Sequence, residues 1–145
     1  MINIFQKIKE FNDKIIKLRT DTDMSLDRYL WFRGVIEEEL DEFALARAKM
    51  NREGSLEARV DMLDAIVDLI YFALGRVYEL GFTEDEFYKH FEFVHDANMK
   101  KIKGNKGRGS DEDAIKLSDW VGPEENMIRY MRSKKDNGRG THSDS

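Results

Sequence analysis

One segment near the middle of the chain limits what the chain can fold into. Residues 60–75, VDMLDAIVDLIYFALG, contain three aspartates among thirteen uncharged residues, ten of which are Val, Met, Leu, Ile, Tyr or Phe. A helix that is apolar on nearly every side is expected to be central and buried. At 3.6 residues per turn, Asp61, Asp64 and Asp68 lie along one stripe of it. Because the segment contains no Lys, Arg or His, a positive partner from outside is needed to offset the cost of burying these charges.

A second acidic group precedes this segment. Residues 37–42, EEELDE, contain five acids and no base. In a helix Glu42 lies four residues after Glu38 and three after Glu39, so the three side chains share one side. If the two acidic stripes face each other on adjacent helices, they form a box of carboxylates. Carboxylate oxygens are the ligands that Mg²⁺ and Mn²⁺ prefer, and Mg²⁺ is commonly shared with substrate phosphates.

Both acidic groups also have ordinary interpretations. A run such as 37–42 is typical of a solvated helix face. The aspartates of 60–75 could instead pair with a cation from another helix, for which Arg33, Arg47 and Lys101 are candidates. Neither interpretation is excluded by the residues alone.

The remaining hydrophobic pattern has helical spacing, and no stretch of useful length alternates as a strand does. It predicts four helices, at roughly residues 2–19, 25–50, 56–80 and 83–101. Ser25 and Ser55 are expected N-caps, and Gly81 suits the position after a helix end. Thr83 and Glu86 have the spacing of a capping box. We therefore predict an all-α fold, a bundle of four to five helices.

The character of the chain changes after the fourth helix, where glycines become frequent and residues 100–108 hold five Lys or Arg. We predict a helical domain over residues 1–102. A Gly-rich basic loop and C-terminal extension over 103–132 is expected to pack on it, and residues 133–145 are expected to be disordered.

Composition excludes several classes of protein. Hydrophobic residues make up 41% of the chain and charged residues 37%, which is typical of a soluble globular protein. The absence of cysteine rules out a disulfide framework and thiolate metal sites, and it suits a reducing cytoplasm. No apolar run reaches about 18 residues, so no membrane span is expected. The net charge of −5 argues against nonspecific nucleic-acid binding.

Three motifs, in this order, resemble those of the all-α NTP pyrophosphohydrolases, which include MazG, phosphoribosyl-ATP pyrophosphohydrolase and dimeric dUTPases. They are EELDE at 38–42, DAIVDLIY at 64–71 and VHDANMKK at 94–101. There is one departure. The family's second motif usually reads E-x-x-D, but position 65 is alanine, and Asp64 stands four residues before Asp68 instead.

The resemblance implies a MazG-like fold that hydrolyses a nucleoside or deoxynucleoside triphosphate to the monophosphate and pyrophosphate. It implies Mg²⁺ as cofactor, with Mn²⁺ as an alternative ion, and a homodimer or homotetramer in a bacterial or virus-infected cell. The implied metal ligands are Glu39, Glu42, Asp64 and Asp68; the implied catalytic residues are Glu38 and Glu39; the implied substrate-binding residues are Asn98, Lys100, Lys101 and Arg33. Trp31 and Tyr71 could stack on a base or simply pack in the core.

Two rival functions remain open at this point. A di-iron bundle needs Glu-x-x-His motifs on two helices, but only His95 follows a glutamate, Glu92, by three residues. The other rival is a non-enzymatic helical interaction module with structural acids. Such a module is not expected to bind Mg²⁺.

Overall fold

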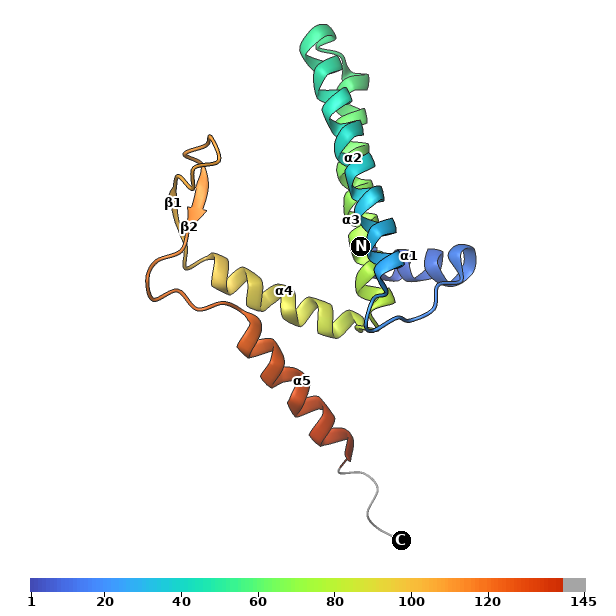
Figure 1. The fold of residues 1–145 in the computed structure, drawn as a ribbon, viewed down its shortest axis with the longest axis vertical. Coiled ribbons are helices and arrows are strands. Elements are labelled where there is room, and N and C mark those ends of the chain that lie inside the picture. The colour runs from blue at the N-terminus through green and yellow to red at the C-terminus, as the bar shows by residue number, and fades with distance from the viewer. Residues whose placement is uncertain (140–145) are drawn as a thin grey trace. The chain divides into compact units, whose positions relative to one another are not determined.

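A computed structural model describes residues 1–139 of the chain. It divides them into two compact units, a first unit over Met1–Thr83 and a second unit that begins at Glu84; the division falls inside the predicted 1–102 domain. Helices dominate both units (Figure 1). Within the described residues, no helix has the length and apolar content that a membrane span requires.

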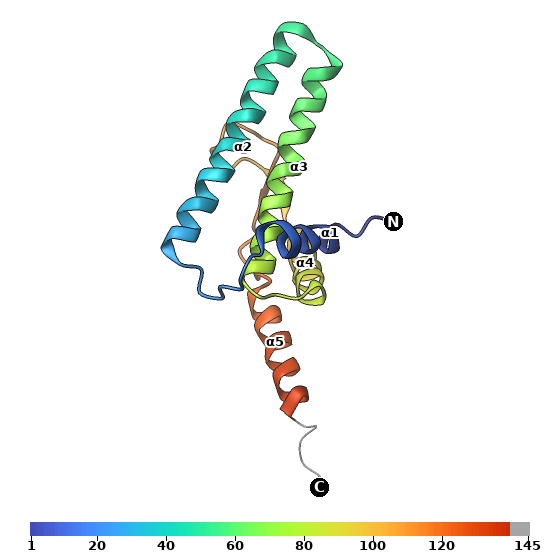
Figure 2. The same cartoon turned by 90° about the vertical axis from the view of Figure 1, so that its right-hand side faces the viewer.

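The first unit is built on an antiparallel pair of long helices, α2 (Leu26–Glu53) and α3 (Leu56–Glu79) (Figure 2). Their ends follow from local chemistry. The Ser25 hydroxyl accepts a hydrogen bond from the backbone N–H of Arg28, and Ser55 does the same for Ala58. Between the helices, Gly54 has a φ of 61°, a left-handed conformation that glycine adopts without strain. The predicted boundaries of this pair are confirmed to within three residues.

The N-terminal helix is shorter than predicted. α1 covers Ile4–Phe11 and continues as a short π-helix, η1, over Asn12–Ile16. The wider π-helical turn ends where the backbone N–H of Lys17 donates to the carbonyl of Asn12, with Lys17 itself left-handed. Phe5 and Ile8 are buried, and α1 packs on α3.

The expectation that residues 60–75 would be buried is wrong for the single chain. Val60, Leu63, Val67 and Ile70 of α3 are each 47–60% exposed. The reason is geometric: α2 covers one side of α3 and α1 covers another, so the rest of its apolar surface has no neighbour within the first unit.

The second unit contains two helices and a strand pair. α4 covers Glu84–Asn98, and α5 covers Glu124–Arg139. Between them, β1 (Ile102–Gly104) and β2 (Asp113–Ile115) form an antiparallel hairpin. The indole N–H of Trp120 donates to the carbonyl of Ala97 (2.6 Å), which ties the segment after the hairpin to the end of α4.

Two predictions for this region need correction. The hairpin was not expected, because strands of three residues are too short to show a period of two in the sequence. α5 also includes residues 133–139, for which the sequence predicts disorder. The rest of that predicted tail, 140–145, lies outside the described residues.

Candidate active site

Glu39, in the middle of α2, is the centre of the candidate site. It is only 8% exposed, and its Oε2 is buried without a hydrogen-bond partner. A buried carboxylate without a partner is costly. Burial raises the pKa of Glu39, and the negative charges of Asp68, Glu42, Glu38 and Asp64 raise it further. Four of the acids implied as metal ligands or catalytic residues therefore lie close enough to act electrostatically on the fifth, Glu39.

The two long helices of the first unit, α2 and α3, carry these five acids. Glu38, Glu39 and Glu42 lie within four residues on α2, and Asp64 and Asp68 lie one turn apart on α3. Because the two helices are antiparallel neighbours, the middle of one faces the middle of the other (Figure 2). This is the facing arrangement that the two acidic stripes predict.

Ala65, the departure from the family's second motif, is 1% exposed. The side chain at this nearly enclosed position is a methyl group, which supplies no ligand oxygen. Asp64 lies one residue earlier and is exposed, and its charge acts on Glu39. The acid is thus displaced from the enclosed position to the adjacent accessible one.

Asp61 differs from the other two aspartates of its stripe. Its carboxylate is 2.8 Å from the Lys49 ammonium, in a groove of about 400 Å³ that Glu42, Arg52 and Asp64 also line. Within residues 1–139, no ion pair joins a Lys or Arg to Glu39, Glu42, Asp64 or Asp68. The positive partner for these four charges is therefore not a side chain of the described residues.

The acids suit a hard divalent cation by their chemistry. They supply carboxylate oxygens alone, and one of those oxygens is buried and unsatisfied. Their side chains are not arranged in a ligating geometry: within the described part of the chain, no three His, Cys, Asp or Glu residues converge closely enough to hold an ion. The chemistry of the donor set fits Mg²⁺ or Mn²⁺.

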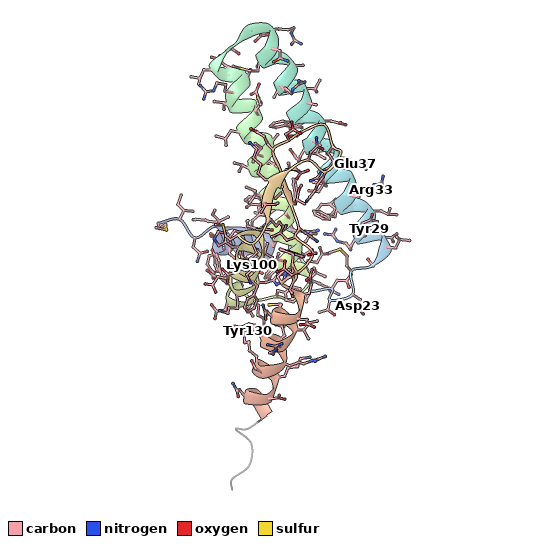
Figure 3. All side chains as sticks on the ribbon, turned by 90° about the vertical axis from the view of Figure 1, so that its left-hand side faces the viewer. Asp23, Tyr29, Arg33, Glu37, Lys100 and Tyr130 are labelled. Atoms are coloured by element: carbon pink, nitrogen blue, oxygen red, sulfur yellow. The ribbon has the colours of Figure 1, made fainter. Side chains whose placement is uncertain are left out.

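The implied substrate residues do not join this cluster. Arg33 pairs with Glu37 one turn along α2, at 2.7 Å, and both are exposed (Figure 3). Asn98, Lys100 and Lys101 belong to the second unit. There the Lys101 ammonium donates to Asn98 Oδ1 (2.6 Å) and lies 5.1 Å from the Trp120 ring centre. Contact of these residues with substrate stays a prediction.

A charged group that the sequence analysis missed lies where α2 begins and α3 ends. Glu79 is 1% exposed and accepts from Arg28 Nε (2.6 Å), while Arg76 Nη1 is 2.7 Å from its second oxygen. Both guanidinium groups lie over the Trp31 ring, with centre distances of 4.2 and 4.7 Å. The only signal in the sequence was that Arg76 and Glu79, three apart, follow directly on the apolar stretch.

A helical hairpin with carboxylates facing each other across its two helices defines the class of the all-α, MazG-like pyrophosphohydrolases. The model of the phosphoribosyl-ATP pyrophosphohydrolase family matches residues 8–98, more than half of the chain, and the chain belongs to this family. The matched region includes all five acids. A search of individual curated proteins found no match. The activity class is therefore hydrolysis of a phosphoanhydride in a nucleotide-like substrate.

The raised pKa of Glu39 predicts how metal-free protein responds to pH. The folded state binds the proton of the Glu39 carboxyl group more tightly than the unfolded state does. The folded state therefore loses stability as pH rises above the ordinary glutamate pKa of about 4.3. The loss is complete once pH exceeds the raised value. We expect Glu39→Gln to melt higher than wild type at neutral pH in EDTA, by about 3 °C, and the difference to vanish near pH 4. Thermal melts across pH 4–8 measure this, and a difference independent of pH would contradict it.

Proposed function

We propose that the protein is a Mg²⁺-dependent pyrophosphohydrolase that converts a nucleoside or deoxynucleoside triphosphate to its monophosphate and pyrophosphate. The observation that carries the proposal is the buried, unsatisfied carboxylate of Glu39 among four further acids. A triphosphate brings negative charge to this cluster, so its binding requires divalent cations between the two. Family membership supports the same reaction class.

Each acid has a proposed role. Glu39, Glu42, Asp64 and Asp68 would hold Mg²⁺, with Mn²⁺ as an alternative. When bound, such an ion neutralises charge on the phosphate oxygens and lowers the pKa of a bound water. Glu38 and the unsatisfied Oε2 of Glu39 accept hydrogen bonds from the attacking water and orient it toward the α-phosphorus.

The substrate contacts are proposed separately. Lys100, Lys101 and Arg33 would donate to phosphate oxygens, and Asn98 to the sugar or base. The pairing of Lys101 with Asn98 supports this because it holds both side chains together. Arg33 would exchange its exposed partner, Glu37, at little cost, since exposed ion pairs contribute less than about 1 kcal/mol.

The experiment is a substrate panel. Purified protein is incubated with the eight common NTPs and dNTPs, in Mg²⁺ and in EDTA, and the products are separated by anion exchange. We expect monophosphate and pyrophosphate, in Mg²⁺ only. Diphosphate with inorganic phosphate would show cleavage at the wrong bond. No consumption of any nucleotide in Mg²⁺ or Mn²⁺ would favour the non-enzymatic interaction module.

A second candidate substrate is phosphoribosyl-ATP, which the family description names. It carries the same α–β phosphoanhydride as ATP, so the acid cluster would serve both reactions in the same way. Including it in the panel distinguishes the two, because a phosphoribosyl-ATP hydrolase would leave the simple triphosphates largely intact.

We also propose that the protein is a homodimer or homotetramer that covers the apolar faces of α2 and α3. Leu45 of α2 is 72% exposed and Leu63 of α3 is 60% exposed. Patches of such residues on a soluble protein usually mark an interface. We propose that a second copy of the chain covers these faces, because each copy exposes the same apolar residues.

This assembly predicts the effect of a single charge. We expect wild type to elute as a dimer or tetramer in size-exclusion chromatography with light scattering. Leu63→Glu should shift it to monomer, since a buried unpaired charge costs several kcal/mol. Glu57→Lys, an exposed change near the start of the same helix, is the control. A monomeric wild-type protein would refute the assembly.

A further inference from the structure

A cavity of about 280 Å³ lies within the first unit, between the N-terminal helical segment, α2 and α3. Its walls are two edge-to-face aromatic pairs. Phe11 and Tyr71 have ring centres 5.4 Å apart, and Trp31 and Phe72 have centres 6.2 Å apart. Ligand sites usually start near 300 Å³, so this cavity suits one flat ring system and not a whole nucleotide.

Arg76 supplies the cavity with a hydrogen-bond donor that has no partner. It is 7% exposed and lines the cavity, and its Nε is buried without an acceptor. One carboxylate, that of Glu79, is shared between Arg76 and Arg28. The group therefore carries one surplus positive charge beside the aromatic walls. An unsatisfied buried donor is destabilising, and a ligand with an acceptor at this position would satisfy it.

Asn12 supplies the matching acceptor. It is 4% exposed, and its Nδ2 donates to the carbonyl of Ile8 (2.8 Å), which fixes the orientation of the amide. Its Oδ1 accepts no hydrogen bond from the described residues. Gly75 faces this amide: a Cβ there would lie 3.6 Å from Asn12 Nδ2, so any larger side chain would intrude beside it.

The cavity also lies at a suitable place relative to the acids. Phe72 follows Asp68 by four residues, so it lies about 6 Å further along the same side of α3. On α2, Trp31 precedes Glu38 by seven residues, again on one side. The Trp31–Phe72 layer thus lies about one to two helical turns from the layer of acids.

We propose that this cavity binds the base of the nucleotide substrate and selects bases with a carbonyl beside a ring N–H, namely guanine, uracil and thymine. The carbonyl accepts from Arg76 Nε, and Asn12 Oδ1 accepts from the ring N–H. Adenine and cytosine present the reverse pattern, an amino donor beside a ring acceptor. The proposal rests on the proposed function, because it takes a nucleotide as substrate.

Binding can be tested without hydrolysis. In a Trp120→Phe background, Trp31 is the only tryptophan, and its fluorescence reports on the cavity. Titrations use GMP, UMP, AMP and CMP in EDTA, with circular dichroism to confirm folding. We expect GMP and UMP to quench Trp31 with Kd values at least about tenfold lower than AMP and CMP. Equal quenching by all four, or none by any, would overturn the proposal.

Arg76→Lys tests the donor while keeping a cation beside Glu79. Turnover of GTP and UTP relative to ATP and CTP should fall about tenfold, through KM and not kcat. Arg59→Lys, at an exposed arginine on the same helix, should leave that ratio unchanged. If Arg76→Lys hydrolyses all four with the wild-type preference, the base-reading role fails and the proposed function stands. If Trp31 shows the base preference but no triphosphate is hydrolysed, the cavity stands and the proposed function fails.

Discussion

Glu39→Gln should lower kcat for triphosphate hydrolysis by about 10²–10⁴-fold. Glutamine has nearly the same shape but cannot carry the negative charge that a divalent cation requires, and its amide cannot accept a proton from water. Glu39 is the only one of the five acids that is buried, with an oxygen that no protein group satisfies. Its loss should therefore remove an interaction that the other four, less buried acids cannot replace.

The measurement is steady-state kinetics at saturating Mg²⁺, with the preferred triphosphate from the substrate panel. Asp41→Asn is the matched control. It removes one charge from the same acidic run, but Asp41 is exposed and is not among the charges that raise the pKa of Glu39. The control should retain activity within about threefold. Equal losses in both variants would mean that the run acts only through its total charge.

Glu79→Gln should reduce the free energy of unfolding by about 3–5 kcal/mol. Glu79 is almost fully buried and is the only carboxylate paired with Arg28 or Arg76 in residues 1–139. Without its charge, two guanidinium groups stacked on one indole ring repel each other. The charged form of Arg76 would be destabilised most, because burial already lowers the pKa of Arg76 and the Glu79 charge opposes that effect.

Urea unfolding followed by circular dichroism measures this loss. Glu37→Gln is the control, because it breaks an ion pair of similar length, Glu37 to Arg33, on the exposed side of α2. That change should cost less than about 0.5 kcal/mol. A similar small cost for Glu79→Gln would mean that the buried group does not stabilise the fold, and would also weaken the case for a preorganised cavity.

What the sequence determined is local. Ser25, Gly54 and Ser55 mark the ends of α2 and α3 because a cap needs only its own helix turn. The acidic stripes were predictable for the same reason, since helical spacing alone puts Glu39 beside Glu42 and Asp64 beside Asp68. The resemblance to the family, which the match over residues 8–98 confirms, then pointed to the reaction class.

Only the tertiary structure decided which of these acids is buried and what lies next to it. Burial of Glu39 depends on α2 and α3 packing together, and no pattern within 37–42 distinguishes it from its neighbours. The ion pair between Arg28 and Glu79 joins residues that are 51 positions apart in the sequence. Asn12 lies in a π-helical turn, which places it in the wall of the cavity and which no residue pattern predicted. Contacts between distant segments depend on how helices pack, and side-chain spacing along one helix does not identify the residues that its neighbour places against it.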